Sequence, residues 1–573
     1  MKKLLTILGL AAALCACKKD FLDRLPQSDI TSPAFFNSEK DLDLYVNSFY
    51  DYLPGTVWDE DVTSDNVEPG VISDLVAGRV VTPTDASSAK WTWTDLRNIN
   101  YFLTHYDKAQ VTDSVKAHYA GIARFFRAMF YFKKVQLFGD VPWYNQPLEA
   151  NSPDLYKGRD PRQLIVDSIL TDLDYAIAHV KSAKSVSRIT KWAALALKVR
   201  VCVFEGAYRN YHKELGLSGT ALLQQGVAAA EQIMQSGNYK LYSTGKPASD
   251  YLNLFAADAA NTDEYILARV YDRTLKTQNA NGTFITPTLG APGLTKSLVN
   301  SYLMKDGTPF SAQPGYATRP YWEEVKDRDP RLAQTIRTPG YARIGTTASL
   351  VPDYSNALTG YQCIKFVTGT DQDANNTNTN DLPVFRYAEV LLNYAEAKAE
   401  LGSFTQVEAD LSINLIRARA GMPAMQVATL TVDPLLQAQY GLSDPKILEI
   451  RRERRVELAM EGFRYQDLMR WKRGPLLAEV FQGAWYPGLG TYDLNGDGKN
   501  DIALVSALPT NPDKTLQYFT LSDKKLSDGN SGNIIIHPTT KKQFLDPKQY
   551  LYPLPRTELL LNKALVQNPG WEN

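Results

Sequence analysis

The chain has 573 residues, of which 44% are hydrophobic, so it is long enough to bury a large core and to form more than one domain. Its 62 Lys and Arg residues are balanced by 63 Asp and Glu residues, which gives a formal net charge of -1 at pH 7. This balance gives no electrostatic argument for a nucleic-acid-binding protein, so we expect no nucleic acid among the partners.

The first 17 residues have the pattern of a lipoprotein signal peptide. Lys2 and Lys3 form a basic start, and the apolar run 4–14 is too short to span a bilayer as a mature helix. The sequence Leu14-Cys15-Ala16-Cys17 matches a lipobox. We therefore predict removal of residues 1–16 and a lipid anchor on Cys17, which would be the only membrane attachment. An ordinary signal peptide with incidental cysteines is the alternative.

Helical periodicity begins at Ser38, which forms a predicted capping box with Asp41, and it returns in several further segments. Small residues such as Ala193, Ala194 and Ala196 recur where neighbouring helices must approach closely. Stacked helical hairpins of this kind predict a mainly α fold with a tetratricopeptide-like scaffold. The helices expected in the first half are 38–53, 93–107, 113–138, 161–181, 190–209 and 219–236.

Two long stretches without helical periodicity, 240–382 and 474–556, are rich in Thr, Asn, Gly and Pro, which predicts loops and short strands. Because they interrupt the helical pattern, we expect one body with a helical lobe and a loop-rich second lobe. The helical lobe would comprise about 38–238 and 384–473. The closing segment 557–573 is expected to be held against the body through Trp571. The helices expected in the second half are 384–402, 405–420 and 443–473.

The helix expected at 443–473 carries arginines close to its apolar side, and a buried guanidinium needs a partner. The helix expected at 384–402 has a polar stripe at helical spacing. We predict that the stripe faces the arginines and holds the two helices in register. The alternative is two solvated faces with local pairs within each helix. The arginines are Arg451, Arg454 and Arg455, and the stripe is Glu389, Asn393, Glu396 and Glu400.

Residues 493–504 have the ligand spacing of a calcium loop. The oxygen ligands would be Asp493, Asn495, Asp497 and Asp501 at positions 1, 3, 5 and 9, with the Lys499 carbonyl at position 7. Position 12 is not the bidentate Glu of an EF-hand, and the spacing resembles the calcium loops of integrin-like β-propeller repeats, where a hairpin flanks the ion. Structural calcium is the only cofactor that we predict. The alternative is a solvated Asn/Gly/Asp turn.

The chain lacks the sequence motifs of common catalytic sites. Its five His residues form no H-E-x-x-H spacing, and neither G-x-S-x-G nor a P-loop occurs. We therefore assign no catalytic residue and expect a protein that is not an enzyme. A lipoprotein glycoside hydrolase stays an alternative, because its two carboxylates need to be close only in space. Beyond the N-terminus, Cys202 and Cys363 are expected to be buried free thiols.

Four ordered blocks resemble the SusD/RagB family of surface nutrient-binding lipoproteins from Bacteroidetes. They are FRYAEVLLNYAEAKAELG (385–402), INLIRARAGMP (413–423), ILEIRRERRVELAMEGFRYQDLMRWKRG (447–474) and YLYPLPRTELLLNKALVQNPGW (550–571). The resemblance implies a scaffold of four helical pairs and a lipid-anchored protein at the surface of the outer membrane. It also implies capture of an oligosaccharide or polysaccharide and delivery to a SusC-type TonB-dependent transporter. Because some members handle peptides, a peptide-binding or scaffold protein built on helical repeats is a second alternative.

Sugar binding requires an aromatic plane against the apolar face of the sugar ring, and Asn, Asp or Arg side chains for its hydroxyls. The segment 93–103 resembles a family helix whose beginning contributes to glycan binding in some members. For each aromatic residue, the alternative is a place in the core. The ligand-binding candidates are Trp58, Asp65, Asn66, Arg79, Trp91, Trp93, Asn100, Trp322, Trp485 and Tyr486.

Overall fold

The structure is a computed structural model that describes residues 35–56, 61–275, 277–280, 291–374 and 376–572. The predicted signal peptide, Cys17 and Trp58 lie outside the described residues. Within these ranges no helix combines the length and the apolar character that crossing a bilayer requires.

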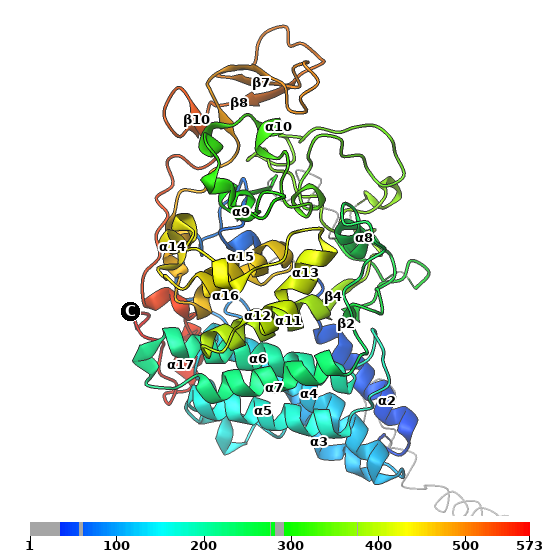
Figure 1. The fold of residues 1–573 in the computed structure, drawn as a ribbon. Helices are drawn as coiled ribbons and strands as arrows, with labels where there is room; N and C mark the ends of the chain where they lie inside the picture. The colour runs from blue at the N-terminus through cyan, green and yellow to red at the C-terminus, as the bar shows by residue number, and fades with distance from the viewer. Residues whose placement is uncertain (1–34, 57–60, 276, 281–290, 375, 573) are drawn as a thin grey trace, which may run out of the picture.

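Long helices pack in pairs at one end of the molecule (Figure 1). Helix α4 packs against α5, and α6 packs against α7. The pair α6 and α7 approaches closely at Gly226, where an added Cβ would lie 3.2 Å from Cys202. These helices confirm the predicted mainly α fold, whereas the tetratricopeptide-like arrangement stays a prediction. Their bounds are α2 (Glu39–Asn47), α3 (Thr94–His105), α4 (Asp113–Phe138), α5 (Arg162–His179), α6 (Lys191–Tyr211) and α7 (Thr220–Gln235).

The helices of the second half lie against this first group. Helix α11 (Tyr387–Glu400) contacts α6, α7 and α15 (Pro445–Glu457). The prediction of a single helix at 443–473 is wrong. It divides into α15 and α16 (Arg464–Arg470), because Met460 and Gly462 between them have left-handed backbones with φ of 63° and 81°. The helix expected at 405–420 divides likewise, into α12 (Gln406–Asp410) and α13 (Ile413–Arg419). Helix α14 (Pro434–Tyr440) precedes α15.

In the described part of the chain, short strands form four small sheets, and all strands except β1 lie in or at the edge of the two loop-rich stretches, as expected. Strands β7, β8 and β10 lie at the end of the molecule opposite α3–α7 (Figure 1). The pairs β1–β3 and β2–β4 are antiparallel, and the other two sheets have the orders β5-β10-β9 and β6-β7-β8. The strands are β1 (Val67–Glu68), β2 (Tyr265–Arg269), β3 (Gly293–Leu294), β4 (Leu382–Arg386), β5 (Trp485–Tyr486), β6 (Gly490–Tyr492), β7 (Ile502–Val505), β8 (Gln517–Thr520), β9 (Lys525–Leu526) and β10 (Gly532–Ile535). The short helices are α8 (Asp250–Ala256), α9 (Lys296–Ser301), α10 (Tyr321–Glu324) and α17 (Arg556–Leu561).

The buried apolar side chains form two large clusters. One is centred on the helices α3–α7 and α11, and the other fills the loop-rich part and takes up Val456 from α15. Cys202 lies in the first cluster and Cys363 in the second, and both are free thiols, as expected. Burial raises the pKa of each thiol to about 12, so neither is a reactive thiolate at neutral pH.

The arginines of α15 are buried and paired. The predicted pairing with the polar stripe of α11 holds for two of the three arginines that the prediction named. Arg451 lies 3.5 Å from Glu400, and Arg454 donates to Asn393 at 2.9 Å. Arg455 does not face the stripe. The 100° step from Arg454 turns it to the other side of the helix, where it meets Asp65 at 3.1 Å.

The other two members of the stripe also take different partners. Glu389 pairs with Arg200 of α6 at 2.6 Å, and Glu396 pairs with Arg470 of α16 at 2.8 Å. The stripe on α11 therefore joins three helices rather than one.

The closing segment is held against the body, as predicted. The Trp571 indole N–H donates to the carbonyls of Lys548 and Leu551, both at 3.0 Å, and the ring is buried. The Asn568 amide donates to the carbonyl of Phe138 at the end of α4, at 3.1 Å. These bonds tie the last residues to the first helical group.

Candidate functional site

The first candidate site is a cavity of about 380 Å³ beside the start of α3, which we call the tryptophan pocket. Three of the predicted ligand residues, Trp91, Trp93 and Asn100, line it together. The Trp91 and Trp93 rings meet edge to face with centroids 5.2 Å apart, and Tyr144 meets Trp93 at 5.5 Å. Because Trp91 is buried, the partly buried rings of Trp93 and Tyr144 are the surfaces available to a ligand.

Asn100 helps to build the wall of the tryptophan pocket. Its amide donates to the Tyr144 carbonyl at 2.9 Å, and its oxygen accepts from Arg127 at 3.2 Å. Arg127 is in turn held by Asp172 at 2.7 Å. Because the polar atoms of Asn100 are already used in these hydrogen bonds, other polar side chains of the pocket must contact the ligand. They are Arg97, Gln146 and Glu558. Aromatic planes beside a few polar groups suit a sugar ring.

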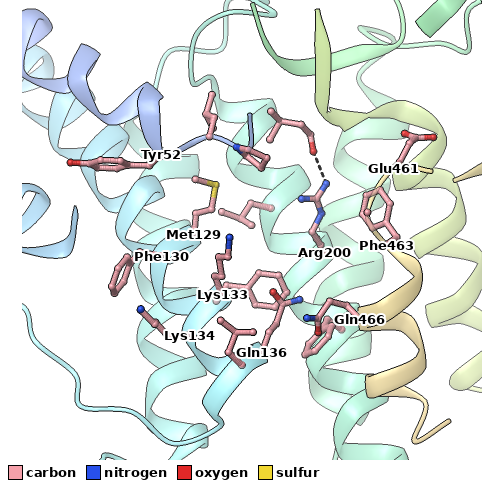
Figure 2. Close-up of a pocket in the computed structure, with 18 of the residues that line it drawn as sticks. Tyr52, Met129, Phe130, Lys133, Lys134, Gln136, Arg200, Glu461, Phe463 and Gln466 are labelled. Carbon is pink, nitrogen blue, oxygen red and sulfur yellow. Dashed lines mark hydrogen bonds between the residues drawn. The ribbon is translucent and has the colours of Figure 1, made fainter. Parts of the chain in front are cut away.

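The second candidate site is a cavity of about 780 Å³ between α4, α6 and residues 461–470, which we call the α4–α6 cleft. The sequence did not point to it. Figure 2 shows Lys133 of α4 and Arg200 of α6 projecting into the space, with Phe463 and Gln466 on the far side. The aromatic residues Tyr52 and Phe130 also line it.

Lys134 lies at the junction of the two cavities. Its ammonium donates to the Lys90 carbonyl at 2.6 Å and lies over the rings of Trp93 and Phe130, at 5.3 Å and 5.0 Å from their centroids. Burial, helped by the charge of Lys133, lowers the pKa of Lys134 to about 7.

The segment 90–95 separates the two cavities. Lys90 and Thr92 line the α4–α6 cleft, whereas Trp91 and Trp93 line the tryptophan pocket. The two cavities therefore lie back to back on one short piece of chain.

Two of the other predicted ligand residues are buried, and a third is exposed. The Asp65 carboxylate accepts from Arg464 at 2.6 Å and Arg455 at 3.1 Å, and Asn66 accepts from Arg455 at 2.9 Å. Although burial opposes it, the charges of Arg455 and Arg464 lower the pKa of Asp65 to about 2. Arg79 is exposed and pairs with Asp74 at 3.1 Å. The structure does not bring these residues to the tryptophan pocket.

Three further candidates lie in the loop-rich part. Trp322 packs against Gly496 of the predicted calcium loop, where an added Cβ would lie 3.3 Å from the indole. Tyr486 is buried, with its ring 4.9 Å from that of Tyr492, and Trp485 precedes it on β5. These aromatics support local packing around the small sheets.

The predicted calcium loop connects β6 to β7, so a hairpin flanks it, as expected. Backbone amides of the loop donate to Asp493, Asp497 and Asp501 at 2.6–2.9 Å. Burial, together with the charges of Asp493 and Asp497, raises the pKa of Asp501. The all-oxygen donor set fits calcium. The described part of the chain contains no group of three or more His, Cys, Asp or Glu side chains gathered closely enough for a metal, so calcium binding stays a prediction.

The sequence matches two family models. One, described as the SusD family, covers residues 254–571, and the other, described as starch-binding associating with outer membrane, covers residues 20–203. The SusD-like protein P38 of Formosa agariphila is 24% identical over 472 residues, which are 78% of this chain and 86% of that protein.

Solved structures share the fold. A SusD-like carbohydrate binding protein from Bacteroides fragilis has a TM-score of 0.68 at 24% identity and covers 93% of this chain and 100% of its own. A laminarin binding SusD-like protein has a TM-score of 0.58 at 20% identity, with the same coverage of 93% and 100%.

Proposed function

The chain belongs to the SusD family, and from this premise we propose that it is a non-catalytic carbohydrate-binding protein associated with the outer membrane. The descriptions of the matching family model and of the solved structures support carbohydrate as the ligand class and the outer membrane as the location. The observation that carries the proposal is the tryptophan pocket, where Trp93 and Tyr144 offer aromatic faces beside polar side chains.

The finer part of the proposal is surface capture and transfer. The lipobox before Cys17 supports a lipid anchor that holds the protein at the cell surface beside a SusC-type TonB-dependent transporter. Tethering raises the effective concentration of the protein at its partner, so binding of modest affinity is sufficient. Modest affinity also lets the oligosaccharide leave for the transporter.

The test is calorimetric binding of the purified chain to laminarin, starch and a panel of plant, microbial and host polysaccharides. We expect Trp93→Ala to lower the affinity for the tightest-binding glycan at least about tenfold, because a stacked aromatic face is lost. Trp192→Ala is the matched control, since Trp192 is also partly buried but lies on α6 outside the pocket, and its affinity should equal that of the wild type.

Two results would overturn the proposal. The first is robust binding of peptides with no binding of any glycan, and the second is the release of sugar products during prolonged incubation. An unchanged affinity in Trp93→Ala with a glycan that does bind would instead show that the tryptophan pocket is not the site.

A further inference from the structure

The α4–α6 cleft is the larger of the two cavities, and most of its negative charge is already neutralised. Two of its carboxylates are held by buried cations: Asp467 accepts from Arg454 at 2.7 Å, and Glu461 accepts from Lys365 at 2.6 Å. A third, the exposed Asp51, lies 4.0 Å from Arg269. Of the described lining carboxylates, Asp95 is the one without a salt bridge.

The positive charge of the cleft is less fully matched. The exposed ammonium groups of Lys90 and Lys133 form no hydrogen bond or ion pair with any residue that the structure describes, and the Lys134 ammonium donates to a neutral carbonyl. The ammonium groups of Lys90 and Lys133 therefore face one free carboxylate, that of Asp95, and Lys134, whose pKa is lowered to about 7, adds only part of a charge. Such an excess in a concave site attracts anions.

The cleft also offers contacts for an uncharged part of a ligand. Phe130 and Phe463 line it, and Figure 2 shows Phe130 on the side of Lys133 and Lys134 and Phe463 beside Arg200. The side-chain oxygen of Gln466 is buried without a hydrogen-bond partner. A buried acceptor left unpaired carries an uncompensated desolvation cost, which a ligand hydroxyl would recover.

We propose that the α4–α6 cleft binds an acidic sugar unit, so that the ligand of this protein is an anionic oligosaccharide. The inference rests on the proposed function, since it names the class of glycan that is captured. The carboxylate or sulfate of the sugar lies against Lys133, because Arg200 is already paired with Glu389, and its ring lies against Phe130 or Phe463. A hydroxyl donates to Gln466. Carboxylate and sulfate share this chemistry.

The experiment measures binding of the purified full chain to matched pairs of oligosaccharides. Each uronate oligosaccharide is paired with its carboxyl-reduced neutral form, and each sulfated oligosaccharide with its desulfated form, which separates the two anion sources. We expect at least one acidic member to bind about tenfold or more tightly than its neutral counterpart, with affinity falling as salt rises from about 0.05 to about 0.5 M.

Lys133→Gln should reduce this preference about fivefold or more and leave the affinity for the neutral form unchanged. Lys305→Gln is the control, because Lys305 is exposed and lies outside the cleft. Both substitutions are on the surface, so equal melting temperatures should accompany the comparison.

The outcomes separate the two proposals. Binding of neutral glycans with no preference for any acidic member overturns this inference and leaves carbohydrate binding intact. An acidic preference that survives Lys133→Gln unchanged also overturns it, because the anion then binds elsewhere. Binding of no glycan at all overturns both.

Discussion

At Asp65, two guanidinium groups occupy the carboxylate that a ligand would otherwise contact. The residue type suits sugar hydroxyls, and its position in an N-terminal loop favoured a ligand role. Burial instead gives Asp65 a structural role, because a buried carboxylate is stable only when it is paired with a positive charge. Arg455 and Arg464 supply the charges, from α15 and α16.

Asp65→Ala should therefore destabilise the fold by about 3–5 kcal/mol, because both arginines would lose a partner in a buried site. Denaturant unfolding measures the change. Asp74→Ala is the control, since its pair with Arg79 is exposed and should contribute less than about 1 kcal/mol. A stable Asp65→Ala protein with weakened glycan binding would show that Asp65 is a ligand residue after all.

Helices were the most predictable elements, and their interruptions were the least. The expected helix at 113–138 agrees with α4, because the acidic start and the Gly139 stop are local signals. The break between α15 and α16 has no such signal at Met460, a non-glycine residue that tertiary packing holds at φ 63°. Gly462, two residues later, is a local signal for the end of a helix, so a break near 462 could have been expected, whereas the left-handed backbone of Met460 could not.

The two candidate sites also differ in how far the sequence could predict them. Trp91, Trp93 and Asn100 lie close in the sequence, so their shared pocket was accessible to prediction. The α4–α6 cleft takes its lining from many segments that are distant in the sequence, among them 51–56, 126–137, 197–204 and 461–470, and only the packing of these segments creates it. No periodicity or motif in the sequence indicates a cavity that forms between distant segments.

The loop between β6 and β7 carries a prediction of its own. Asp497→Ala should weaken calcium binding at least about tenfold, because it removes one of the few charged ligands of the loop. Metal content and protease sensitivity of the loop in the presence of calcium are the measurements. Asp513→Ala, in the following exposed loop, is the control. The same metal content and cleavage pattern in both variants would refute calcium binding by this loop.

Across the whole molecule, buried carboxylates paired with arginines connect helices that are distant in the sequence. Glu396 of α11 accepts from Arg470 of α16 and from the Trp471 indole, at 2.8 Å each. Although burial opposes it, the Arg470 charge lowers the pKa of Glu396 to about 2, the same value as for Asp65. The global stability should therefore depend on pH.

Both carboxyls have folded pKa values below their unfolded values of about 4, so the unfolded chain binds more protons in this range. Their contribution is complete above about pH 5 and is lost as the pH falls towards 2, on the order of 2 kcal/mol for each group. Glu396→Gln should be less stable at pH 7 and show a flatter profile between pH 5 and 2. Unfolding in denaturant at a series of pH values tests this, and parallel profiles would contradict it.

The segment 90–93 also limits how the chain can change in length. Lys90 and Thr92 line the α4–α6 cleft, whereas Trp91 and Trp93 line the tryptophan pocket. A residue inserted among these four would displace side chains of both cavities at once. The spacing before α3 is therefore constrained from two sides, because neither cavity can be reshaped there without the other.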